Sequence, residues 1–100
     1  MIVIAVTVPI NADKHDAVVE ATVAMRNATL AEDGCFEYRF SFATDDPGMM
    51  LIFEEWRDAE ALTAHFSAPH MAVFQGALGQ LVTGALVGHR YEVSSKGPLR

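Results

Sequence analysis

A proline at position 69 separates two stretches of helical pattern, and this arrangement constrains the fold more than any other part of the chain. Asp58 offers an N-cap oxygen to the first stretch, and good helix formers follow it. Pro69 disfavours the α conformation in the preceding residue but suits the first turn of a new helix. A strand ending at Trp56 comes before both stretches. The sequence therefore predicts a strand followed by a bent pair of helices, with His65 just before the bend and His70 just after it.

Three more strands and one more helix are expected around this stretch. The expected elements are a strand at 2–10, a helix from 11 or 13 to about 31, a hairpin of strands at 35–43 and 49–56, and a strand from 84 or 85 to 93. The long helix should bury a stripe consisting of Val18, Ala21, Met25 and Ala28. Gly34 can end this helix in a left-handed conformation. The order β-α-β-β-α-β predicts an α+β fold, a ferredoxin-like sandwich with an antiparallel four-stranded sheet.

The first strand is apolar on both faces, because Ile2, Ile4, Val6 and Val8 alternate with Val3 and Ala5. In the strand at 35–43, Phe36, Tyr38, Phe40 and Phe42 are expected to share one face. Glu37 and Arg39 share the other, where an ion pair with Glu54 across the hairpin is expected. Helices cover only one face of such a sheet, so a second copy of the chain is the simplest cover for the other. The sequence therefore predicts a homodimer.

The composition sets limits on the class of protein. One hundred residues suffice for one domain, expected at 1–93, with a polar tail at 94–100. The net charge of −6 argues against partners such as nucleic acid or an anionic membrane, which bind clustered Lys and Arg. No apolar run is long enough to span a bilayer and no signal peptide is evident, which predicts a cytoplasmic protein. Cys35 is the only cysteine and is expected to be a small buried hydrophobe, so no disulfide or thiolate metal site is expected.

Two histidines are the candidate catalytic residues. His65 lies at the edge of the buried helix face and can point between helix and sheet. It is either a partly buried histidine bonded to a nearby carbonyl or a general base, since an imidazole has an unperturbed pKa of about 6.5. His70 is in the first turn of the next helix, where the helix dipole favours the neutral form. It is either a second base or a surface or capping group.

A pocket between helices and sheet would be lined by aromatic and apolar side chains, although each is equally suited to the core. The candidates for substrate binding are Tyr38, Phe40, Trp56, Leu62, Phe66 and Phe74. A metal site is not expected, because His65 and His70 are five residues apart across a proline. The chain has no phosphate-binding loop and no dinucleotide fingerprint, which disfavours ATP and NAD.

Two segments of the sequence resemble one known family. They are Glu55-Trp56-x-Asp58-x-x-Ala61-Leu62-x-x-His65 with Ser67-x-Pro69-His70-Met71, and Gly34-Cys35-x-x-Tyr38 upstream. This pattern resembles the antibiotic biosynthesis monooxygenase domain, in the manner of quinol monooxygenases. The resemblance implies a dimeric α/β barrel, and the family includes cofactor-free monooxygenases, haem-degrading oxygenases and an isomerase. Haem-degrading members resemble this chain least, because Thr7, His65 and Gln75 stand where those members have Asn, Trp and the axial His.

The sequence and the resemblance together favour a cofactor-independent monooxygenase that uses dioxygen to oxidise an electron-rich phenol or hydroquinone to a quinone. His65 would act as the base or stabilise the anion, with His70 in reserve, while Trp56 and Tyr38 hold the ring. One alternative is an isomerase or decarboxylating enzyme that moves protons with the same histidines. Another is a dimeric module that binds a small molecule without turnover.

Overall fold

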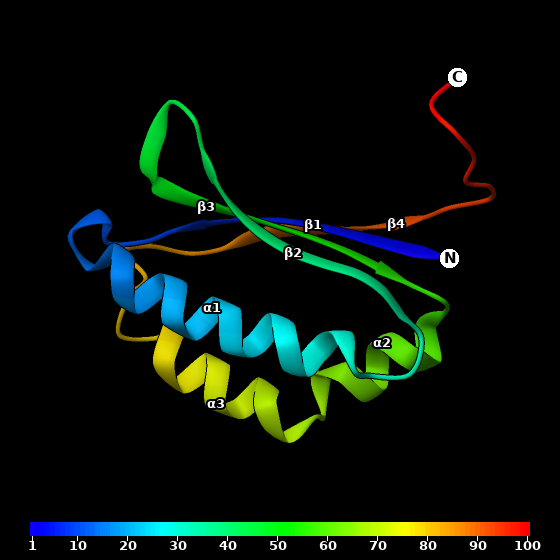
Figure 1. Ribbon diagram of the computed structural model, residues 1–100, viewed down its shortest axis with the longest axis horizontal. Coiled ribbons are helices and arrows are strands. Elements are labelled where there is room, and N and C mark those ends of the chain that lie inside the picture. The colour runs from blue at the N-terminus through cyan, green and yellow to red at the C-terminus, as the bar shows by residue number, and fades with distance from the viewer.

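The computed structural model describes all 100 residues, which form a four-stranded sheet with the α-helices on one side (Figure 1). The elements are β1 (Ile2–Pro9), the 3-10 helix η1 (Ala12–Lys14), α1 (His15–Leu30), β2 (Cys35–Ala43), β3 (Asp46–Trp56), α2 (Ala59–Phe66), α3 (Pro69–Leu78) and β4 (Val87–Glu92). The strand order is β2-β3-β1-β4, and each neighbouring pair is antiparallel. This confirms the predicted ferredoxin-like topology. No helix is long and apolar enough to cross a membrane.

The alternation of β1 gives the sheet its buried face. In the register with β3, Ile2 lies opposite Trp56 and Val8 opposite Met50, and all four side chains are buried beneath the helices. The odd-numbered residues of β1 point to the other face. β1 is a central strand, paired with β3 on one side and β4 on the other, which fits its two apolar faces.

The buried stripe of α1 differs in part from the predicted one. Its buried residues are Val18, Thr22, Met25 and Thr29, while Ala21 and Ala28 are only partly buried. Burial of a threonine is tolerated here because the Thr22 hydroxyl donates to the Val18 carbonyl at 2.8 Å. The hydroxyl oxygen of Thr29 is buried without a hydrogen-bond partner. The predicted stripe, which was based on hydrophobicity, is therefore correct for Val18 and Met25 and wrong for the other two positions.

The predicted break between the last two helices is confirmed. The Asp58 side chain accepts a hydrogen bond from the Ala61 N–H at 2.9 Å and caps α2. Ala68 has an extended backbone, and Pro69 is the first residue of α3. The chain therefore turns between the two helices rather than continuing as one.

The start of β2 departs from simple alternation. A register shift between Cys35 and Glu37 inserts one extra residue, so Cys35 lies opposite Trp56 on the buried side. Phe36 is 55% exposed, so the prediction that it shares the face of Tyr38 is wrong. Gly34 precedes this bulge with φ of 84°, the left-handed conformation expected there, and a Cβ at this position would lie 2.6 Å from Cβ of Ala61.

The face of the sheet away from the helices is apolar and open. It has a hollow of about 340 Å³, and the exposed large side chains that line it are Leu51, Phe53, Val87 and Tyr91. The last strand begins at Val87, later than expected, and the tail leaves the sheet near the N-terminus (Figure 1). Lys96 in this tail contacts Glu55 at 3.3 Å. The second apolar face from which a dimer was predicted is therefore present.

Candidate active site

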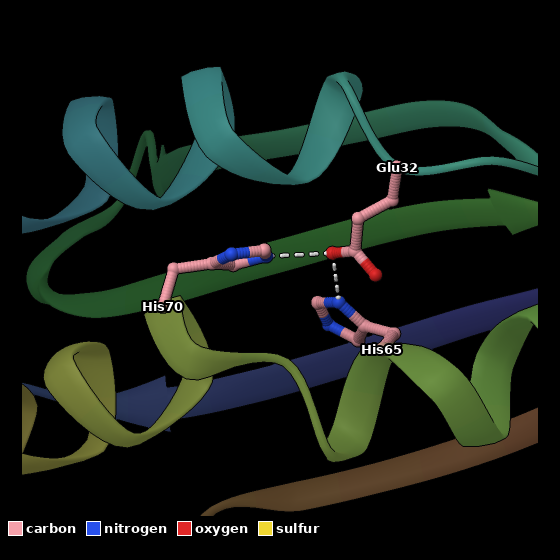
Figure 2. A group of neighbouring side chains, drawn as sticks. All are labelled: Glu32, His65 and His70. Carbon is pink, nitrogen blue, oxygen red and sulfur yellow. Dashed lines mark hydrogen bonds and ion pairs between the residues drawn. The ribbon is translucent and has the colours of Figure 1, made fainter.

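Two histidines and a glutamate meet at the end of the molecule where α1, α2 and α3 converge (Figure 2). Nδ1 of His65 and Nε2 of His70 each lie 2.7 Å from the same carboxylate oxygen, Oε2 of Glu32. Figure 2 shows the carboxylate descending from the turn after α1 while the rings approach it from α2 and α3. The sequence separations of 33 and 38 residues make this a product of the tertiary fold.

Local features of the chain explain why the three side chains converge. Glu32 follows the last turn of α1, where its backbone N–H donates to the Thr29 carbonyl and fixes the turn. His65 lies in the last turn of α2 and His70 is the second residue of α3. Because Pro69 starts a new helix, both rings can face the same oxygen.

The three side chains of the cluster differ in how deeply they are buried. The side chain of His65 is 1% exposed, that of Glu32 is 15% and that of His70 is 26%. Burial lowers the pKa of His65, and the neighbouring carboxylate of Glu32 opposes this effect. A neutral His65 that donates through Nδ1 leaves Nε2 with its lone pair. Since a carboxylate oxygen only accepts, Nε2 of His70 is the donor in its contact with Glu32.

Aromatic rings enclose His65. Its ring centroid lies 4.6 Å from that of Trp56, 5.4 Å from that of Tyr38 and 5.8 Å from that of Phe66. Burial is the main cause that raises the pKa of Tyr38, so its hydroxyl stays protonated. This apolar wall limits the solvation of any charge that develops on His65.

A second buried carboxyl group lies behind Trp56. The indole Nε1–H of Trp56 donates to Oε1 of Glu54 at 2.9 Å, and burial raises the pKa of Glu54 to about 7 despite this hydrogen bond. The prediction that Glu54 pairs with Glu37 and Arg39 across the hairpin is wrong. Arg39 instead contacts Glu37 at 3.3 Å, whereas Glu54 is buried beneath the helices.

The predicted lining residues do not surround one pocket. Tyr38, Trp56, Leu62 and Phe74 are buried core residues, Phe40 is partly buried against them, and Phe66 is 59% exposed. None of the five main pockets of the chain is lined by His65 or Trp56. The rings of His65 and Trp56 instead pack against each other, with centroids 4.6 Å apart.

Access to the cluster lies instead at its two flanks. His70 and Phe74 border a cavity of about 100 Å³ between α1 and α3. Glu32 borders a surface pocket of about 270 Å³ together with Asp33 and Arg57. A molecule approaching the cluster would thus meet His70 or Glu32 before His65.

Sequence reasoning missed both carboxylates of this region. Glu32 was not singled out, and Glu54 was expected only as an ion-pair partner of Glu37 and Arg39 across the hairpin. The spacing argument against a metal site considered only the two histidines, and in this fold the third ligand-type side chain comes from the turn after α1. Glu32 stands just outside the segment Gly34-Cys35-x-x-Tyr38 that resembles the family, so no local signal pointed to it. Of the three positions that depart from the haem-degrading pattern, Thr7 and Gln75 are exposed, whereas His65 is buried.

Comparison with known proteins now identifies the family. The antibiotic biosynthesis monooxygenase family matches residues 1–77, from β1 through most of α3, and this range includes the whole cluster. The chain belongs to this family. In sequence, the chain is similar to "Putative monooxygenase Rv0793" of Mycobacterium tuberculosis, with 37% identity over 60 residues, covering 60% of this chain and 58% of that protein.

Solved structures of the family share the fold. A "putative antibiotic biosynthesis monooxygenase" from Deinococcus radiodurans superposes with a TM-score of 0.89 at 29% identity, covering 100% of this chain and 99% of that one. The structure of Rv0793 gives a TM-score of 0.86 at 25% identity, covering 97% of this chain and 98% of that one. The chain spans about half the length of the curated relatives that it matches in sequence, 58% of one and 50% of the other.

Proposed function

We propose that this family member is a monooxygenase that converts an electron-rich phenol or hydroquinone to a quinone with dioxygen and without a cofactor. One oxygen atom of dioxygen becomes bonded to a ring carbon and the other is released as water. The substrate supplies all four electrons that reduce the dioxygen. The observation that carries the proposal is the pair of histidines joined by Glu32, in a family named for monooxygenases. This cluster can take the phenolic proton, and a phenolate reduces dioxygen far more readily than a phenol.

The exposures support His70 rather than His65 as the base that meets the substrate. His70 is the more exposed of the two rings and borders a cavity. When Nδ1 of His70 takes a proton, the Glu32 carboxylate at 2.7 Å from Nε2 stabilises the imidazolium. His65 holds the same carboxylate from the other side and so acts as a positioning residue.

The cavity beside His70 sets a requirement for substrate entry. At about 100 Å³ it is smaller than the roughly 150 Å³ engineered cavity known to hold benzene. An aromatic substrate therefore needs the gap between α1 and α3 to open. Phe74, which lies next to Phe40 with ring centroids 5.5 Å apart, supplies the apolar wall that would contact the ring.

The homodimer belongs to the same proposal. We infer that two copies pair through the open face of the sheet, where Leu51, Phe53, Val87 and Tyr91 expose apolar surface. Burying such a patch is the usual reason for a stable subunit contact. The net charge of −6 per chain does not oppose this contact strongly, because the patch residues themselves are uncharged.

A second candidate reaction is an isomerisation by proton transfer. Two imidazoles bridged by a carboxylate suffice to remove a proton at one carbon and return it at another. Anaerobic assays separate the candidates, because only the monooxygenase consumes dioxygen.

The test is oxygen uptake and quinone formation with a panel of phenols and hydroquinones, in the presence of a metal chelator. His70→Gln should reduce the rate by roughly 100-fold or more, the usual contribution of a general base. His15→Gln, which changes an exposed histidine at the start of α1, is the matched control and should retain the rate. Equal rates in wild type and His70→Gln would refute the role of this residue.

A further inference from the structure

We propose that Glu32, His65 and His70 also form a binding site for one divalent transition-metal ion, with Zn²⁺ as the simplest occupant. This goes beyond the proposed reaction and does not depend on it, since it concerns only the donor atoms of the cluster. The three potential ligand atoms all lie within 4.8 Å of one another. Two imidazole nitrogens and one carboxylate oxygen form a donor set common to zinc and other first-row divalent ions.

The cluster is close to the geometry that a metal requires. With bonds of about 2.0–2.1 Å, tetrahedral ligands lie about 3.4 Å apart. Both rings are now 2.7 Å from the Glu32 oxygen, so this oxygen must withdraw by about 0.7 Å. Glu32 is the member best able to move, because its long side chain extends from a turn whereas both histidines are held on helices. The two ring nitrogens, which lie within 4.8 Å of each other, must also settle at about 3.4 Å apart.

The surroundings favour a cation with open coordination positions. Glu32 and His70 keep some solvent exposure, so water can complete the coordination on that flank. Arg57 is the nearest basic group in the adjoining pocket, and it is already paired with Asp33 at 3.1 Å and Asp58 at 3.0 Å. On the inner side, Tyr38 and Trp56 hold the His65 ring in position. The site therefore has three donors, one carboxylate charge and no uncompensated cation nearby.

A metal ion competes with the hydrogen bonds that now join the cluster. To bind through Nδ1 of His65 and Nε2 of His70, the proton on each nitrogen must move to the other ring nitrogen or leave. A bound ion also occupies the groups that would take a substrate proton. Zn²⁺ should thus inhibit the proposed reaction, and a chelator should restore it.

The test uses chelator-treated protein of all 100 residues, titrated with Zn²⁺ by calorimetry and with Co²⁺ by visible absorption, without any substrate. One ion should bind per chain, and Glu32→Gln and His70→Gln should each weaken binding by about 100-fold or more. His15→Gln, a histidine outside the cluster, should bind like wild type. Circular dichroism checks that each variant is folded. In wild-type protein, the ring NMR signals of His65 and His70 should shift on adding Zn²⁺ while that of His15 stays unchanged.

Absence of binding, equal affinity in all variants, or shifts confined to other histidines would overturn the metal site and indicate adventitious surface binding only. The two proposals fail separately. If Zn²⁺ binds but no oxygenase activity is found, the metal site is supported and the proposed reaction is not. If the protein is active in the presence of chelator but binds no metal, only the proposed reaction is supported.

Discussion

Glu54 should make the stability of this protein fall as the pH rises. Its carboxyl group is buried, and its pKa is raised from 4.5 to about 7, chiefly by burial and further by the charge of Glu32. A carboxyl group with a raised folded-state pKa holds its proton more tightly in the folded than in the unfolded chain. The resulting stabilisation is complete below about pH 4.5 and is lost as the pH rises to about 7.

The size of the effect follows from this shift. A pKa change from 4.5 to about 7 corresponds to about 3 kcal/mol of folding free energy. Glu54→Gln removes the ionisation but keeps an oxygen that can accept the Trp56 indole N–H. The free energy of unfolding of the variant minus that of wild type should therefore rise by up to about 3 kcal/mol between pH 4.5 and pH 8.

Urea unfolding followed by the fluorescence of Trp56, the only tryptophan, measures this difference directly. The protein concentration must be the same throughout, because the stability of the proposed dimer would depend on it. Glu60→Gln removes a carboxylate from the exposed side of α2 and is the matched control. Parallel stability curves for wild type and Glu54→Gln across this pH range would refute the reasoning.

Three further substitution pairs test other parts of the structure. Gly34→Ala should lower the free energy of unfolding, measured in urea titrations, by about 2 kcal/mol or more, because φ is positive and the added Cβ would lie 2.6 Å from Cβ of Ala61. Gly76→Ala in α3 should instead raise it by up to about 1 kcal/mol, because an added Cβ there meets nothing within 4 Å. Thr29→Val should raise the free energy of unfolding by about 1 kcal/mol, because it removes a buried hydroxyl group that has no hydrogen-bond partner. Thr22→Val breaks a hydrogen bond, and an equal gain in that variant would contradict the explanation. Phe53→Asp on the open sheet face should give a monomer in sedimentation velocity while Val23→Asp on α1 stays dimeric; a dimeric Phe53→Asp would place the contact elsewhere.

The fold was predictable from sequence because its determinants are local. The cap at Asp58, the break at Pro69 and the left-handed Gly34 each act within a few residues, and each is confirmed. The order of elements along the chain, β-α-β-β-α-β, then led to the ferredoxin-like sandwich. By contrast, the bulge after Cys35 was missed, since it depends on how β2 pairs with β3 and leaves no mark on the alternation itself.

The site was predictable only in part, because its key contact is long-range. The two histidines were singled out from their places on either side of Pro69. Glu32 was not, because nothing within its own segment indicates that two rings more than 30 residues away will share its oxygen. Glu54 was misplaced for a related reason, since a carboxylate in a strand usually faces solvent, and only burial beside Trp56 reverses this.

The central claim is that Glu32, His65 and His70 act as one reactive unit. The most direct test is the rate of dioxygen consumption with a quinone-forming phenol for wild type, Glu32→Gln, His70→Gln and the double variant, all in chelator. The claim predicts that each single change removes nearly all activity and that the double change costs little more than either alone. Wild-type rates in the single variants, or losses that simply multiply in the double variant, would contradict it.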